Sequence, residues 1–146
     1  MIEFKEITTG RTAWFEWDLD LSFEVKKLTR ADFMQARKAG ERYAKLKHID
    51  KDEAVALQLG RFSIINWRGL KYRHLPELCD NVGVPDGRGD EMIPYDEEAR
   101  DEILLRMSLD LSNFLGKAQE EFLSVIEAAA EKNSVHGSNG GVTLGD

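Results

Sequence analysis

Apolar and polar residues alternate along the first part of the chain, and this alternation predicts strands. Ile2 and Phe4 have polar neighbours on both sides, and the turn signal Thr8-Thr9-Gly10-Arg11 follows them. Two further runs each keep one parity: Phe15, Trp17 and Leu19, then Leu21, Phe23 and Val25. Asp is common in turns and depleted in strands, so we place the break near Asp18-Leu19-Asp20, although the parity also fits one long strand. We therefore predict an antiparallel β-meander over residues 1–28.

The spacing changes to a helical one after Thr29. Thr29 and Asp32 form a variant capping box, which predicts the start of a helix of about four turns. Its apolar face holds Phe33, Ala36, Gly40 and Tyr43, and its opposite face holds Lys38, Arg42 and Lys45. The basic face has two interpretations, a solvated surface or a docking face for a partner.

A second helix is predicted to begin at Asp50 and to occupy the centre of the fold. Apolar residues lie on more than one of its sides: Val55, Leu57, Leu59, Phe62, Ile64, Ile65 and Trp67. A helix with this pattern packs against both a sheet and other helices. We expect it to end at Trp67, with Gly69 in the left-handed conformation that terminates helices. We interpret Trp67 as a core anchor in preference to a ligand platform.

A long polar connection follows, over residues 71–91. It is rich in Gly and Pro, and Leu75–Leu78 is predicted to form a single helical turn within it. Loops of this length are usually functional or mobile. Residues 80–91 have the length of a calcium loop, but Val82 and Val84 stand where oxygen ligands are needed, so we reject calcium binding.

The C-terminal part of the chain predicts two more helices. Pro94 keeps Ile93 extended and Tyr95 leads to Asp96, which can cap a short helix carrying Ile103, Leu104 and Met107. Ser108 or Asp110 then caps a long helix with the best amphipathic pattern in the chain. Its stripe consists of Leu111, Leu115, Ala118, Phe122, Val125 or Ile126, and Ala129, with Phe114 and Leu123 beside it. We expect part of this stripe to close the core and the rest to await a partner.

These elements predict an α+β fold that is predominantly helical, with a short N-terminal antiparallel β-meander packed on four or so helices. The length of 146 residues, with 42% hydrophobic and 32% charged residues, fits one domain over residues 1–132. Within it, 1–28 form the meander and 29–132 the helical part. The small and polar residues 133–146 predict a disordered tail.

Charge is unevenly distributed. The segment 26–48 has eight basic and two acidic residues, a net of +6, so the remainder carries −13 of the overall −7. Such polarity suits an acidic partner or the acidic part of a second copy, and we therefore expect self-association. The predicted partner-binding residues are the basic Lys38, Arg42 and Lys45 and the apolar Phe114, Phe122 and Ile126.

The residues that carry enzyme chemistry are absent or scattered in the sequence. Cys79 is the single cysteine, and His48, His74 and His136 follow no ligand spacing. We predict no catalytic residue, cofactor or metal, and we rank an enzyme last. The chain has neither an apolar run of about 20 residues nor a signal peptide, so we expect a cytosolic protein without membrane contact.

Two segments on either side of the long connection carry a family resemblance. The pairing of Trp67-x-Gly69-Leu70 with Ile93-Pro94-Tyr95-Asp96-x-Glu98, followed by Leu-rich helix, resembles the tail assembly chaperones of long-tailed bacteriophages. The resemblance covers roughly the second half of the chain, and the connection 71–91 is longer than the short acidic turn expected in this family. We take Trp67, Gly69, Pro94 and Tyr95 as structural anchors.

The resemblance implies a non-enzymatic chaperone that binds the tape-measure protein and other tail components. Such a protein would act in the host cytoplasm during tail tube assembly and be absent from the mature virion. A nucleic-acid-binding regulator that uses the basic helix is the first alternative, although base-reading side chains do not interleave with its lysines and arginines and the net charge is negative. A structural tail component of the virion is the second.

Overall fold

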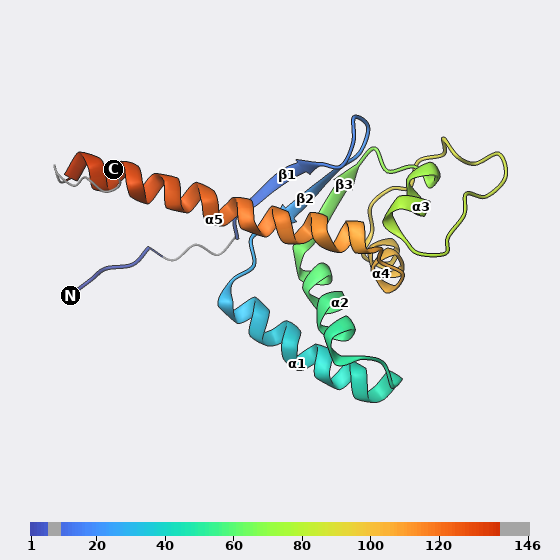
Figure 1. Ribbon diagram of the computed structural model, residues 1–146, viewed down its shortest axis with the longest axis horizontal. Coiled ribbons are helices and arrows are strands. Elements are labelled where there is room, and N and C mark those ends of the chain that lie inside the picture. The colour runs from blue at the N-terminus through green and yellow to red at the C-terminus, as the bar shows by residue number, and fades with distance from the viewer. Residues whose placement is uncertain (6–9, 138–146) are drawn as a thin grey trace.

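A three-stranded antiparallel sheet forms one layer of the protein, and the helices lie on one side of it and below it (Figure 1). The computed structural model describes residues 1–5 and 10–137, with side-chain surroundings up to Leu123. The strands are β1 (Thr12–Glu16), β2 (Ser22–Lys26) and β3 (Ile64–Arg68), in the order β1-β2-β3. The predicted α+β class is confirmed.

The membership of the sheet differs from the predicted meander. Residues 1–5 form no strand, and Ile2 and Phe4 are 73% and 82% exposed. The third strand is instead Ile64–Arg68, which we had predicted to be helical. This strand pairs antiparallel with β2, with Phe23 opposite Trp67. The pairing places Ile64 and Trp67 in the core, and burial of this kind overrides a helical spacing pattern.

The turn between β1 and β2 lies where the aspartates predicted it. The Oδ1 of Asp18 accepts hydrogen bonds from the backbone N–H groups of Asp20 and Leu21, both at 2.8 Å. This arrangement is the local Asp turn that competes with strand geometry. Leu21, Phe23 and Val25 are fully buried on the inner face of β2, as their parity indicated, whereas Leu19 is exposed at the tip of the turn.

Helices α1 (Arg30–Lys47) and α2 (Lys51–Ser63) form an antiparallel hairpin that lies below the sheet in Figure 1. Both predicted N-caps are confirmed: Thr29 and Asp32 form a reciprocal capping box, and Asp50 accepts from the N–H of Glu53. The two helices approach closely at Gly40, because a Cβ there would lie 2.7 Å from the backbone of Val55. Helix α2 ends at Ser63, four residues earlier than predicted.

The long connection after β3 contains little regular secondary structure, but several contacts hold it in place. It contains the 3₁₀ turn η1 (Tyr72–His74) and the single-turn helix α3 (Leu75–Leu78), the latter as predicted. Lys71 forms an isolated β-bridge with Met92, and Arg73 donates its backbone N–H to the carbonyl of Gly89. Arg88 stacks over the ring of Tyr72 at 4.5 Å. The loop is thus fastened to its own starting segment.

Helix α4 (Glu97–Leu105) and helix α5 (Leu109–Gly137) complete the fold. Asp96 caps α4 through the N–H of Ala99, and Ser108 caps α5 through the N–H of Leu111. The first half of α5 crosses the inner face of the sheet (Figure 1), and its Leu111, Leu115 and Ala118 enter the core. Helix α5 continues to Gly137, so the predicted tail begins inside a helix, and its remaining residues 138–146 lie outside the described part of the chain.

Candidate partner-binding groove

The two segments that carry the family resemblance meet in space. The indole N–H of Trp67 donates to the carbonyl of Ile93 at 2.8 Å, and the rings of Trp67 and Tyr95 pack edge to face with centroids 4.8 Å apart. Pro94 lies exposed between these two contacts, and the hydroxyl of Tyr95 accepts a bond from buried Arg100. Trp67 thereby joins β3 to the segment that leads into α4. Trp67 and its acceptor Ile93 are 26 positions apart in the sequence.

Gly69 has the left-handed backbone that we expected, but for a different reason. Its φ is +80°, and it follows a strand and not a helix. A Cβ at this position would lie 1.8 Å from the carbonyl oxygen of Asp20. Gly69 therefore permits close contact between the end of β3 and the β1–β2 turn.

The apolar residues that we predicted to bind a partner serve the core. Phe122 is only 4% exposed and packs edge to face on Phe15, and half-buried Phe114 contacts both Trp17 and Phe23 in the same manner. This corrects their assignment to a docking surface, because the sheet covers the side of α5 on which they lie. The side chain of Ile126 lies outside the described residues.

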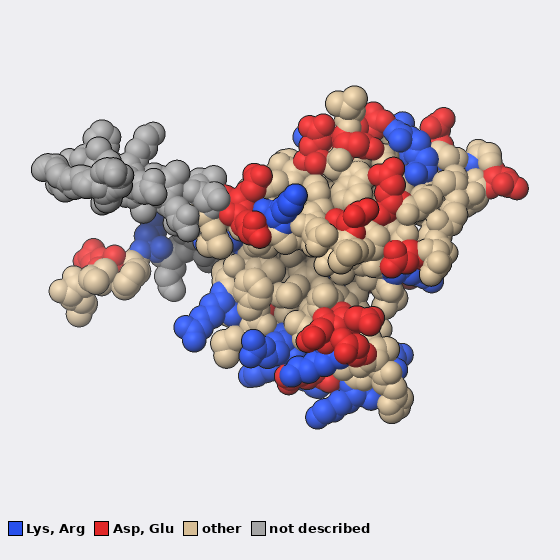
Figure 2. All heavy atoms as spheres, viewed as in Figure 1, with Lys and Arg blue, Asp and Glu red and all other residues tan. Residues whose placement is uncertain are grey.

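The basic residues Lys38, Arg42 and Lys45 are exposed on α1, as predicted. Within the described part of the chain, none of the three lies in salt-bridge reach of a carboxylate. Figure 2 shows basic side chains gathered over the surface that α1 forms. Arg42 lies about 180° around the helix from Phe33, at about 100° per residue, so these residues do not share a face with Phe33.

Two hollows lie where the α1–α2 hairpin packs against α4 and α5. One cavity of about 350 Å³ lies between the start of α1, α2 and α5, and a second of about 430 Å³ lies between the end of α1, α4 and the start of α5. Both are lined by Ala56, Met107 and Ser112, so they adjoin each other. We call these two adjoining cavities together the hairpin groove.

Large apolar side chains that line the groove remain exposed. Phe33 is 47% exposed at one end, and Leu109 is 72% exposed at the other, with Ile49 and Leu105 beside it. Exposed apolar surface gathered in one concavity is typical of a binding site. We did not predict this surface from the sequence, because the spacing placed Phe33 on an inward face and each helix was considered alone. Leu105 and Leu109 indicated it, since these apolar residues lie outside both predicted stripes.

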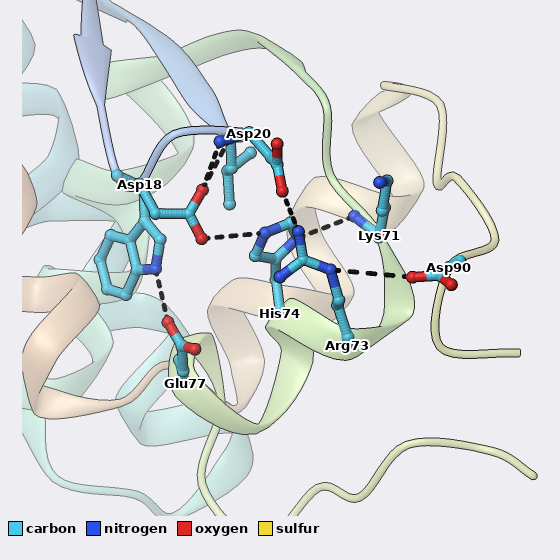
Figure 3. A network of polar contacts seen from close by, with 9 residues as sticks. Asp18, Asp20, Lys71, Arg73, His74, Glu77 and Asp90 are labelled. Carbon is cyan, nitrogen blue, oxygen red and sulfur yellow. Dashed lines mark hydrogen bonds and ion pairs between the residues drawn. The ribbon is translucent and has the colours of Figure 1, made fainter.

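A polar network ties the β1–β2 turn to η1 and α3 (Figure 3). His74 is fully buried, and its Nδ1 accepts the backbone N–H of Lys71 at 3.0 Å. Its Nε2 lies 3.2 Å from the Oδ2 of Asp18 but is not aligned with it as a hydrogen-bond donor. Arg73 pairs with Asp20, and the indole of Trp17 donates to Glu77.

The fold shifts the pKa values of Asp18, which lies in this network, and of Cys79. Burial acts to raise the pKa of Asp18, but the N–H groups of Leu21 and Asp20, together with His74 and Arg73, outweigh it and hold that pKa below its ordinary value. Burial raises the pKa of the Cys79 thiol, which disfavours the nucleophilic thiolate. In residues 1–5 and 10–123 no group of three or more His, Cys, Asp or Glu side chains could hold a metal ion. We interpret the network as a fastening between elements.

Comparison with known proteins gave no significant match to this chain. No protein-family model matches it, and neither a curated protein nor a solved structure is significantly similar to it. Among the described helices, none combines the length and apolar character needed to cross a membrane.

Proposed function

We propose that this protein is a non-enzymatic tail assembly chaperone of a long-tailed bacteriophage, which binds the tape-measure protein and assists assembly of the tail tube. The observation that carries the proposal is the hairpin groove, whose lining combines exposed Phe33, Leu105 and Leu109. A concave apolar surface of this kind can cover apolar segments of another chain until that chain assembles. The proposed place of action is the host cytoplasm, with release before the virion is complete.

The family resemblance selects this function among protein-binding functions. Its two segments, 67–70 and 93–98, contact each other through Trp67, Ile93 and Tyr95, so they form one structural unit. Helix α4, which this unit positions, supplies Leu104 and Leu105 to the groove. The two segments with the family resemblance, 67–70 and 93–98, thus hold in place a helix that lines the hairpin groove.

Co-expression with a tape-measure protein from the same genome tests this function. The expected result is a larger soluble fraction of the tape-measure protein, and a complex of the two proteins on purification. An unchanged soluble fraction, with no complex, would overturn the proposal. Mass spectrometry of purified virions distinguishes a chaperone from a structural tail component, because only the latter remains in the particle.

The exposed basic residues of α1 support one second candidate, a nucleic-acid-binding regulator. Binding of that kind neutralises phosphates, so its affinity would fall steeply with salt. We rank it second because Lys38, Arg42 and Lys45 have no aromatic platform beside them on the outer face of α1. The absence of any binding signal for single-stranded and duplex DNA at low salt would remove this candidate.

A further inference from the structure

Gly116 of α5 has no role in the packing of this chain. It lies in the middle of a helix, where Gly costs about 1 kcal/mol relative to Ala, and a Cβ added there would meet nothing within 4 Å. Two other helical glycines have clear partners, since a Cβ at Gly40 would strike Val55 and one at Gly60 would strike Leu104. Gly116 lines the hairpin groove, so its missing side chain leaves the groove open.

The walls of the groove favour a helix as occupant over an extended segment. Both long walls, α2 and α5, are helices, whose internal backbone N–H and C=O groups already bond within the helix. An extended chain in such an apolar groove would leave its own backbone groups without partners, which is costly. A helix satisfies its backbone internally and can place an apolar stripe on the groove.

The dimensions of the groove agree with this interpretation. Phe33 and Tyr43, which line opposite ends, are separated by ten positions of α1, which corresponds to about 15 Å along its axis. About three turns of a bound helix would therefore contact the groove. Small residues on both walls, Ala56 on α2 and Ser112 and Gly116 on α5, allow the backbone of that helix to approach closely.

Positive charge at the end of the groove near Phe33 indicates the charge of the side chains expected on the bound helix. Arg30 and Arg37 lie three positions before and four positions after Phe33, so all three share one side of α1. Both arginines are exposed, and within the described residues neither pairs with a carboxylate. Acidic side chains at this end of a bound helix would complement them, whereas Glu53 and Asp80 line the other end of the groove.

We infer that the hairpin groove binds an amphipathic helix of about three turns, with acidic residues flanking its apolar stripe, supplied by another protein. The inference deepens the proposed function by naming the class of segment in the tape-measure protein that the groove would recognise. It requires no rearrangement of the core, because the groove is already open.

Designed peptides test the inference directly. The probe is a fluorescent helical peptide with a Leu stripe at i, i+3, i+4 and i+7 and Glu at the flanking positions. One control has Lys in place of Glu, and another has the same composition in scrambled order. We expect the Glu-flanked peptide to bind at least tenfold more tightly than either control, as measured by anisotropy. Equal binding of the ordered and scrambled peptides would overturn the inference of a helix, and tighter binding of the Lys-flanked peptide would overturn the inferred charge.

Matched variants of the protein locate the binding site. Gly116→Leu adds a side chain at a position that lines the groove, where a Cβ meets nothing within 4 Å, whereas Asn113→Leu adds the same side chain at an exposed position of α5 outside the groove. We expect the first to weaken peptide binding tenfold or more and the second to leave it unchanged. Likewise, Arg37→Glu should weaken binding more than Arg42→Glu, which makes the same change of charge on the far side of α1. Equal effects within either pair would overturn the assignment of the site.

Three further outcomes separate this inference from other occupants and from the proposed function. If Gly116→Leu converts a self-associated wild type into monomers, a second copy occupies the groove and the inference is overturned. If the tape-measure protein is solubilised equally by wild type and by Gly116→Leu, the proposed function stands and the groove assignment falls. If the peptide binds but no tape-measure protein is solubilised, the inference stands and the proposed function falls.

Discussion

At the scale of single residues, the contrast between two glycines shows which sites the fold requires. Gly69 needs a positive φ and lies against the carbonyl of Asp20, so Gly69→Ala brings both strain and overlap. We expect this variant to lose roughly 3 kcal/mol of unfolding free energy. Denaturant unfolding followed by circular dichroism measures the loss. A change below about 0.5 kcal/mol would show that the β1–β2 turn and β3 do not meet as described.

We expect Gly116→Ala to change the unfolding free energy in the opposite direction, that is, to stabilise the protein. The added methyl group meets no atom within 4 Å, and Ala is the better helix former, so the variant should gain about 1 kcal/mol of unfolding free energy. The same denaturant titration measures it beside wild type. A destabilised Gly116→Ala would mean that the groove is closed in solution.

At the scale of elements, the β1–β2 turn is joined to η1 and α3 by a carboxylate whose pKa depends on folding. The pKa of Asp18 is lower in the folded protein than its ordinary value, so its contribution to stability is present above the pKa of about 3.9 that Asp has in the unfolded chain. That contribution is lost as pH falls through the lower, folded pKa. Stability should therefore decline below about pH 4.

Asp18→Asn isolates this effect, because the amide oxygen can still accept from the N–H groups of Asp20 and Leu21 but does not titrate. We expect the variant to lose about 1 kcal/mol near neutral pH, where hydrogen bonds to a charged acceptor become neutral ones. Its decline in acid should be shallower than that of wild type. Parallel curves of unfolding free energy against pH for the two proteins would refute the account of the turn.

Elements with local signals were predictable from the sequence. The caps at Thr29, Asp50, Asp96 and Ser108 depend on a side chain and backbone groups within three residues, so their sequence patterns suffice. The alternation in β2 was equally local. The assignment of Ile64–Arg68 was wrong because its apolar residues fit a helical and a strand pattern, and only pairing with β2 decides between them.

The candidate site was less predictable than the fold. Phe122 and the exposed Phe33 both lie on amphipathic stripes, and no local pattern shows that the sheet covers the first and leaves the second open. The groove requires the packing of the hairpin against α4 and α5, which depends on close approaches such as that of Gly60 in α2 to Leu104 in α4. Sequence reasoning found the basic residues of α1 but not the apolar surface near them.

At the scale of the whole molecule, we expect self-association on the basis of charge. The segment 26–48 carries +6 and the remainder −13, and Figure 2 shows basic side chains over α1 with acidic ones among them. Because Phe122 is buried, it cannot supply the apolar contact between copies that we expected from it. Exposed ion pairs alone contribute little to the free energy of association. We expect association at low salt that disappears near 0.15 M salt, where charges are screened beyond about 8 Å. Sedimentation across salt concentration measures it, and salt-resistant oligomers would contradict this expectation.

We expect the hairpin groove to be open in the free protein and covered when a partner binds. Gly116→Cys places a reactive thiol in the groove, and Asn113→Cys places one on α5 outside it. The native Cys79 is buried with a raised pKa, so it should contribute little to labelling. Labelling rates with a thiol reagent, with and without the co-purified tape-measure protein, provide the measurement. The account predicts fast labelling of both variants when free and at least tenfold protection of Gly116→Cys alone in the complex, whereas equal labelling of Gly116→Cys in both states would contradict it.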